Sequence, residues 1–266
     1  MKKTLMAAAL VAFAPAVQAA PFIDFEVGGG LTFPSLNDGG TGSGDDRVSF
    51  TDSGGDVQLD LEANNGFYLG GRLGLPIVPD IKLRYERLTF ENSNFEETFE
   101  AFGETYQADG EIFLDMSYID TVFFYGLPDL VPGVDYFVDL GVNLRWLLGG
   151  FEAEIDGGDS ESFDFPGIPL PAAHIAAGAT IPTVDVELSG ELNILPLSGL
   201  SHRDWNVKAR WFAPLPVDFV ARVGVEAGYR SWTVDIDGED AGLIDDDDFQ
   251  LDFETSGFFV GTAITF

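Results

Sequence analysis

The chain has 266 residues with 13 basic and 45 acidic side chains, a net charge of −32 and no cysteine. This length suits a single domain, and the missing cysteines exclude disulfides as the means of holding an exported fold together. The acidic composition argues against a nucleic-acid partner, because such a surface repels phosphates.

Residues 1–19 have the pattern of a cleavable export signal. Lysines at positions 2 and 3 precede the apolar run Leu5–Val17, and small residues stand at positions 17 and 19. We therefore expect cleavage after Ala19 and one mature domain at 20–266. The run is shorter than the about 20 apolar residues of a spanning helix, and no later stretch reaches that length without charges. A membrane protein with this sequence has to cross with strands.

Alternation of apolar and polar residues with period two dominates the mature chain and predicts β-strands. In the clearest segment, Tyr136 and Trp146 belong to the apolar face, and Asp139 and Arg145 to the polar face. Ten steps separate Tyr136 from Trp146, or about 33 Å of strand, which at a tilt of about 40° matches the roughly 25 Å lipid-facing band of an outer-membrane barrel. The predicted segments are 22–33, 57–75, 80–90, 111–127, 135–148, 171–181, 184–195, 204–213, 218–233 and 249–266.

These segments predict an all-β fold, a transmembrane up-and-down antiparallel β-barrel of ten strands, with eight or twelve as alternatives. The count is least secure at 111–127 and 171–181. In the former, Asp115 and Asp120 fall on opposite faces, so one of them interrupts either assignment.

The third segment, 80–90, changes face along its length. Its first apolar residues alternate regularly, but Leu88 and Phe90 fall on the other face. A β-bulge near Glu86 or Arg87 would produce this change, so we expect one there.

The connections alternate between two kinds. Short connections with proline are expected at 76–80, 128–134, 182–183 and 214–217. Long, glycine-rich acidic connections are expected at 34–56, 91–110, 149–168 and 234–248. Outer-membrane barrels have short periplasmic turns and longer extracellular loops, so both termini are expected on the periplasmic side.

The last strand ends the chain with an aromatic residue. Phe258, Val260, Thr262, Ile264 and Phe266 share one face. This ending resembles the C-terminal signal by which the barrel-insertion machinery recognises outer-membrane proteins. We therefore expect that machinery and outer-membrane lipid as partners, and the outer membrane of a Gram-negative bacterium as the location.

Three short glycine-containing motifs suggest a family. They are Val27-Gly28-Gly29-Gly30, Leu140-Gly141-Val142-Asn143-Leu144-Arg145 and Ala227-Gly228-Tyr229-Arg230. With them the mature chain resembles small proteobacterial outer-membrane β-barrel proteins, and among these an uncharacterised family with a glycine pair in the first strand. The resemblance implies a barrel fold and an outer-membrane location, and it supplies no catalytic residues.

Most basic residues fall on the polar face of the strands, which points into the barrel when the apolar face meets lipid. A charge that faces lipid near the midplane costs about 2–4 kcal/mol for Arg or Lys, so inward placement is expected. The predicted lumen charges are Arg72, Lys82, Arg84, Glu86, Asp139, Arg145, Asp185, Glu187, Glu191, Lys208, Arg210, Arg222, Glu226 and Arg230.

A charged lumen has two interpretations. It either passes or binds small polar solutes, as in a porin-like conduit, or it forms a salt-bridge network that fills a narrow barrel. We favour the filled barrel, because a barrel of about eight strands is already packed by its side chains and desolvated charges need partners.

Counted together with Glu111, the four long connections hold 26 of the 45 acidic residues. Clustered carboxylates suit hard cations such as calcium or magnesium, which could link the surface to lipopolysaccharide phosphates. The densest run, and the candidate metal site, is Asp245, Asp246, Asp247 and Asp248. The alternative is a solvated, self-repelling loop, since blocks of like charge are usually disordered. No other cofactor is expected.

An enzymatic function is not expected. His202 lies in the run Ser201-His202-Arg203-Asp204 at the predicted outer rim, and His174 is predicted to point into the barrel. Triads are recognised by geometry rather than by adjacency in sequence. The sequence therefore leaves a structural or narrow-conduit barrel first, a surface binding module second, and a rim enzyme at His202 third.

Overall fold

The computed structural model describes residues 24–42, 47–101, 104–128, 135–155, 160–165, 167, 169–197, 199–214, 221–237 and 250–266. All regular elements in these ranges are strands, and none of the ranges contains a helix long and apolar enough to cross a membrane. The expected export signal at 1–19 lies outside the described residues.

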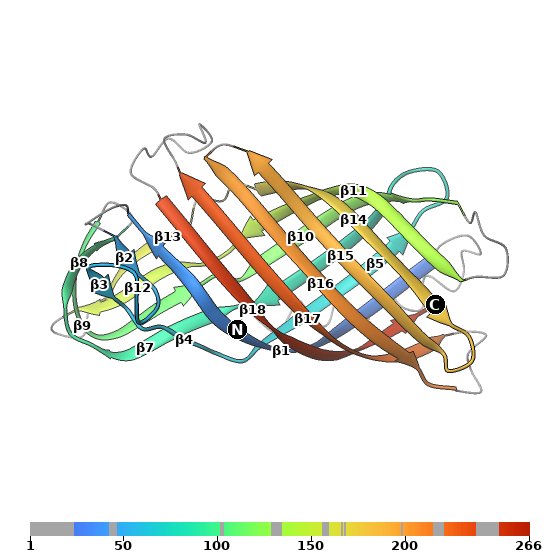
Figure 1. Cartoon of the computed structure of the whole chain (residues 1–266), viewed down its shortest axis with the longest axis horizontal. Helices are drawn as coiled ribbons and strands as arrows, with labels where there is room; N and C mark the ends of the chain where they lie inside the picture. Colours follow the sequence, from blue (N-terminus) through green and yellow to red (C-terminus); the bar gives the residue numbers. More distant parts are fainter. Residues whose placement is uncertain are drawn as a thin grey trace.

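Ten antiparallel strands form a closed barrel, in which each strand pairs with its neighbour in the chain and the last pairs with the first (Figure 1). In order they are β1 (Asp24–Thr41), β5 (Gly66–Gly74), β6 (Asp80–Arg87), β10 (Tyr118–Gly126), β11 (Tyr136–Leu147), β14 (Pro169–Ile181), β15 (Val186–Leu197), β16 (Leu200–Phe212), β17 (Arg222–Asp237) and β18 (Gln250–Thr265). The predicted up-and-down barrel of ten strands is confirmed.

One end of the barrel carries short turns, and we call it the turn end. It holds the turn at 182–185 and the described residues Asp24 and Phe266. The C mark on the right of Figure 1 lies at this end. The Phe266 amide donates to the Phe25 carbonyl at 2.8 Å, and the two rings stack with centroids 6.0 Å apart. The last residue therefore fastens the seam between β1 and β18.

The other end continues into a second sheet, and we call this part the extension. Its strands are β2 (Val48–Ser49), β3 (Val57–Gln58), β4 (Glu62–Ala63), β7 (Thr89–Phe95), β8 (Thr98–Ala101), β9 (Glu104–Asp115), β12 (Gly150–Ile155) and β13 (Ser160–Asp164). Strands β13, β12, β9, β7 and β4 lie side by side, β8 pairs with β9, and β2 and β3 lie beside β1 (left in Figure 1).

The expectation of long loops at 91–110 and 149–168 is therefore wrong for most of these residues. They form hairpins that prolong β6, β10, β11 and β14 beyond the barrel. Their apolar residues are buried against one another, as the exposed fractions of 0% at Ile112 and Ala153 show. Burial of this apolar face stabilises strands that composition alone marked as acidic loops.

The predicted bulge at Glu86 or Arg87 is also wrong. Glu86 pairs with Tyr118, and Thr89 pairs with Asp115, three residues further along each strand, so no residue is inserted on either side. Glu86, Leu88 and Phe90 all stay on the inward face. This face changes from polar to apolar because β6 ends at Arg87 and the chain passes from the barrel into the extension, whose interior is an apolar core. The same passage separates Asp115 from Asp120 and removes the ambiguity of 111–127.

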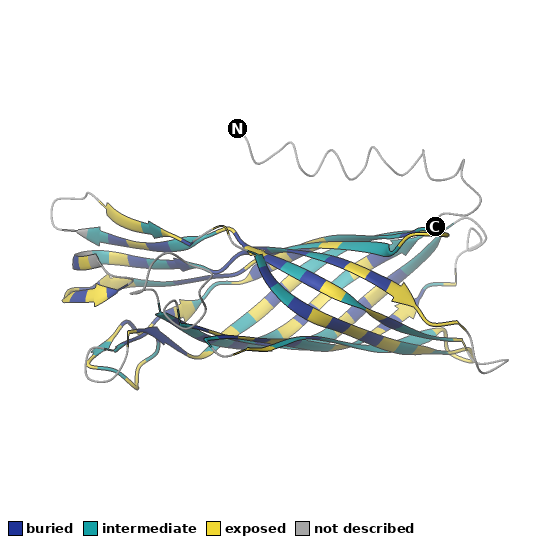
Figure 2. Cartoon of the chain, turned by 90° about the horizontal axis from the view of Figure 1, so that it is seen from above, coloured by how far each residue is buried: buried dark blue, intermediate teal, exposed yellow. Residues whose placement is uncertain are grey.

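The outward face of the barrel exposes large apolar side chains in strict alternation with buried ones (Figure 2). On β11, Val142 is 50% exposed, whereas the neighbouring Asn143 is 0% exposed. Water-soluble proteins rarely expose a contiguous apolar surface of this extent. This surface is the counterpart of the lipid-facing band that the sequence predicted.

The apolar band has a sharp edge towards the extension. The outward aromatic residues Phe33, Phe258 and Tyr229 are direct neighbours on β1, β18 and β17. Two residues further towards the extension, the next outward row consists of serines: Ser35, Ser256 and Ser231. The apolar band therefore ends between these two rows.

Each of these strands has 16 or 18 residues, more than the about 9–11 residues that a spanning strand needs. The surplus residues build the wall of the extension.

Candidate functional site

Buried charges fill the middle of the barrel, with Arg145 at their centre. Its guanidinium donates two parallel hydrogen bonds of 2.7 Å to Asp120 and also contacts Asp204. Its carbon Cζ lies 3.9 Å from the centroid of the Tyr118 ring and 4.6 Å from that of Trp232. Arg145 and Asp204 are 0% exposed, and bidentate charge-assisted bonds of this kind are the strong ones.

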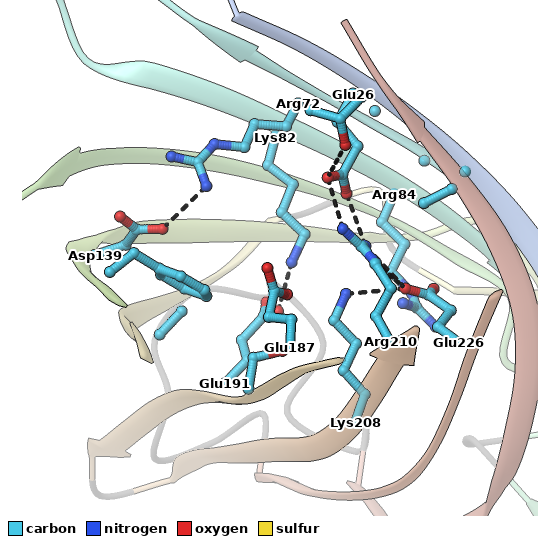
Figure 3. A pocket seen from close by; sticks show the side chains of 18 of the residues that line it. Glu26, Arg72, Lys82, Arg84, Asp139, Glu187, Glu191, Lys208, Arg210 and Glu226 are labelled. Carbon is cyan, nitrogen blue, oxygen red and sulfur yellow. Dashed lines mark hydrogen bonds and ion pairs between the residues drawn. The ribbon is translucent and has the colours of Figure 1, made fainter. Parts of the chain in front are cut away.

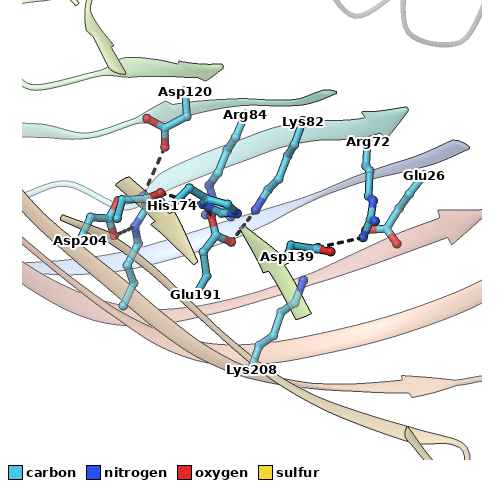
Figure 4. A network of polar contacts seen from close by, with 12 residues as sticks. Glu26, Arg72, Lys82, Arg84, Asp120, Asp139, His174, Glu191, Asp204 and Lys208 are labelled. Carbon is cyan, nitrogen blue, oxygen red and sulfur yellow. Dashed lines mark hydrogen bonds and ion pairs between the residues drawn. The ribbon is translucent and has the colours of Figure 1, made fainter. Parts of the chain in front are cut away.

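Arg230 connects this centre to Glu86. It donates to Asp204 through Nε at 2.8 Å and to Glu86 through Nη1 at 2.6 Å. Glu86 also accepts from the Tyr118 hydroxyl at 2.7 Å and from Arg84 at 2.9 Å. We call Arg84, Glu86, Tyr118, Asp120, Arg145, Asp204 and Arg230 the central network; it contains three cations and three carboxylates (Figure 4 shows part of it).

The central network crosses the lumen from wall to wall. Tyr118 lies on β10, the fourth strand around the barrel, and contacts Trp232 on β17, the ninth, with ring centroids 5.3 Å apart. In a ring of ten strands these two are diametrically opposite. The side chains of the two walls therefore meet in the middle of the barrel.

An apolar cluster lies between the central network and the tip of the extension. Phe253 packs on Trp232 and on Phe90, with centroids 5.2 and 5.4 Å apart. The segment at 48–61 enters this cluster with Phe50 and Leu59, both 0% exposed. The mouth of the barrel on this side is thus closed by a hydrophobic core.

Towards the turn end the lumen contains a cavity of about 390 Å³ (Figure 3). Lys82 reaches across it from β6 to Glu191 on β15 at 2.5 Å, and Arg72 on β5 lies 3.4 Å from Asp139 on β11. Figure 4 shows these pairs between the central network and Glu26. Because terminal residues of the strands, such as Asp24 and Thr265, line the cavity, it faces the turn end.

A second group of charges lines the β1, β16 and β17 side of the cavity. Arg210 donates to Glu26 at 2.7 and 2.9 Å and to Glu226 at 2.8 and 3.0 Å. Glu226 also accepts from Lys208 at 3.2 Å and from the Tyr68 hydroxyl at 2.6 Å. The cavity wall is therefore held by side chains that are already paired.

Thirteen of the fourteen predicted lumen charges lie in the cavity wall or the central network. The exception is Asp185, which is exposed in the turn at 182–185 with a positive φ of 50°. The strand was predicted to begin two residues too early. Asp120, Asp204 and Tyr118 were not predicted as lumen residues, although the period-two pattern on β10 and β16 could have indicated all three.

The run Ser201-His202-Arg203-Asp204 does not assemble a triad. His202 is buried with an exposed fraction of 1%, and neither ring nitrogen has a hydrogen-bond partner among the described residues. Ser201 faces outward, and Asp204 is held by Arg145 and Arg230. His174 points into the lumen as predicted, where its Nδ1 lies 2.8 Å from the Asn193 amide oxygen.

The candidate metal residues Asp245, Asp246, Asp247 and Asp248 lie outside the described residues. Across the ranges that the structure describes, no three histidine, aspartate or glutamate side chains are arranged to hold a metal ion.

Comparison with known proteins identifies no family. No protein-family model and no curated protein matches the chain. Among solved structures, the outer membrane protease OmpT from Escherichia coli is similar, with 11% sequence identity over 92% of this chain and 96% of that chain and a TM-score of 0.43. At this level of similarity, we carry no residue or activity of the protease over.

Proposed function

We propose that this protein is an integral outer-membrane β-barrel that does not conduct solutes and has a structural role, holding the extension at the cell surface. The outward apolar band supports membrane insertion, because it would otherwise contact water along the whole barrel. The turn end faces the periplasm and the extension faces outward, as short turns and long outer segments do in this class. No catalytic step belongs to the proposal.

The depth of insertion has two markers on opposite sides of the barrel. Tyr85 is followed two residues later by the exposed Arg87 on β6, and Trp205 is preceded by the exposed Arg203 on β16. These strands are third and eighth around the ring of ten. Aromatic side chains favour the membrane interface, so the arginines are placed at the level of lipid phosphates. This arrangement supports phosphorylated outer-leaflet lipid as a partner.

The observation that carries the closed lumen is the contact between Tyr118 and Trp232 across the barrel, with Arg145 stacked against both rings. Opening the lumen requires separating Arg145 from two carboxylates. A buried charge left without its partner is strongly destabilising, which favours the closed state.

Conductance in a planar bilayer tests this function. We expect the refolded mature protein to show no discrete current steps. The double variant Arg145→Ala and Arg230→Ala removes the cations that link the walls and should show small steps if it inserts. Arg203→Ala, on the outward face of β16, is the matched control and should remain silent. Current steps in the unchanged protein would refute the closed lumen and favour the narrow conduit.

The second candidate is a surface binding module. It is favoured by exposed carboxylates on the ordered extension, among them Glu96, Glu97, Glu152 and Glu161. Calcium titration by calorimetry on the folded protein tests it. Heat that saturates, together with protection of the extension from protease, would support cation binding; absence of both would exclude it.

A further inference from the structure

The cavity at the turn end has an unequal distribution of charge on its two sides. The wall formed by β11, β14 and β15, with the residue just before β11, carries four carboxylates and no lysine or arginine in the cavity lining: Asp135, Asp139, Glu187 and Glu191. We call it the acidic wall. Every lysine and arginine that lines the cavity comes from β5, β6, β16 or β17.

Strand β14 contributes a small inward residue to the acidic wall. Ala176 lines the cavity and stands between Asp139 on one neighbouring strand and Glu191 on the other. Two cations of the barrel itself, Lys82 and Arg72, extend across the lumen to this wall, which shows that the wall holds cationic groups.

Some polar groups in the cavity retain unused bonding capacity. Glu187 has no ion pair or hydrogen bond among the described side chains, and Figure 3 shows it facing the cavity with Lys82 and Lys208. Lys208 has three donors and uses one towards Glu226. Arg222 stacks over the Phe212 ring at 3.9 Å without an ion pair among the described residues. One carboxylate and two cations with unused bonding capacity thus line the same cavity, on the adjacent strands β15, β16 and β17.

We propose that this cavity is a binding site for a small zwitterion that carries a primary ammonium and a carboxylate, as amino acids do. The ammonium binds Glu187 on β15, and the carboxylate binds Lys208 and Arg222 on the next two strands, β16 and β17. The volume of about 390 Å³ is within the usual range for small-molecule sites, about 300–1,000 Å³. A ligand with one charge leaves either Glu187 or the two cations unpaired, so the site selects against it.

The site rests on the proposed function only for the side from which the ligand enters. Because the proposed barrel is closed on the extension side, the ligand enters from the periplasm. Binding itself is measured without a membrane. Calorimetry on the mature protein in detergent micelles compares 4-aminobutanoate with butylamine and butanoate, which each carry one of its two charges. We expect 4-aminobutanoate to bind at least about tenfold tighter than either, or about 1.4 kcal/mol.

Variants locate the site. Glu187→Gln and Lys208→Gln should each weaken 4-aminobutanoate binding at least about tenfold. The matched control is Asp185→Asn, an exposed carboxylate two residues before Glu187 and outside the cavity. Because Glu187 has no partner to lose, its substitution leaves the fold intact.

Equal binding of butylamine, absence of binding, or unchanged affinity in Glu187→Gln would each overturn the zwitterion site. Current steps in the planar bilayer would refute the closed lumen and leave the binding result standing, so the two failures are distinguishable.

Discussion

Arg145 is the central residue of the ion-pair network inside this barrel. It is completely buried, it binds Asp120 and Asp204, and it lies against two aromatic rings that touch each other. Two carboxylates around one guanidinium would repel each other without it. The residue therefore holds β10, β11 and β16 together from the inside, where a soluble protein would have an apolar core.

We predict that Arg145→Met destabilises the barrel by about 3–5 kcal/mol, because Asp120 and Asp204 are left buried without this partner. Urea unfolding in liposomes, followed by tryptophan fluorescence, measures the change. Glu62→Met, at an exposed position on β4 of the extension, is the control and should unfold close to the unchanged protein. A loss below about 1 kcal/mol would mean that the central network contributes little to stability.

Among the elements, the seam between β1 and β18 closes the barrel. The two strands pair from Glu26 with Thr265 to Gly40 with Asp252, with one shift in register between Leu36 and Asp38. Glycines on both strands let Tyr68 lie flat against the seam and reach Glu226. A Cβ on Gly261 would lie 2.1 Å from the Tyr68 hydroxyl and 2.7 Å from the Gly29 carbonyl oxygen.

Gly261→Ala is therefore expected to displace Tyr68, break its hydrogen bond to Glu226 and cost about 1–3 kcal/mol. Gly190→Ala is the matched control, since the nearest atom to its Cβ would be 3.5 Å away. The same urea unfolding experiment compares the two variants. If both unfold alike, the fit of Tyr68 against the glycines does not limit the stability of the seam.

At the scale of the whole molecule, three layers follow one another along the lumen: the cavity, the central network and the apolar cluster of the extension. The polar layers lie at the level of the outward apolar band, and the apolar layer lies beyond it. This order is the reverse of that in a soluble protein, since the apolar side chains of the barrel point outward and its charges point inward. The parts of β1, β17 and β18 that extend beyond the apolar band form the wall of the extension.

Phe266 directly follows β18, the strand that closes the barrel by pairing with β1. We propose that the last strand is recognised by the insertion machinery, so deletion of Phe266 should lower the amount of folded barrel in cells. Refolding of the same variant in detergent should change little, because only one hydrogen bond and one ring contact to Phe25 are lost. Heat-dependent migration in gel electrophoresis measures both. An equal loss in cells and in detergent would assign Phe266 a purely structural role.

The sequence by itself determined the barrel, its ten strands and the inward direction of most charges. These properties depend on period-two alternation, which is local and which lipid on one face and charge on the other keep strict. Thirteen of the predicted lumen residues, such as Arg145 and Glu226, follow from that alternation alone.

Only the tertiary structure decided which charges pair, which side chains meet across the lumen and what the acidic connections form. Arg145 meets Asp204, and Tyr118 meets Trp232, across strands that are far apart in sequence. The hairpins of the extension are stabilised by apolar contacts such as Phe90 with Phe253, which join different segments. Contacts of this kind depend on the curvature and closure of the whole sheet, and no local pattern contains that information.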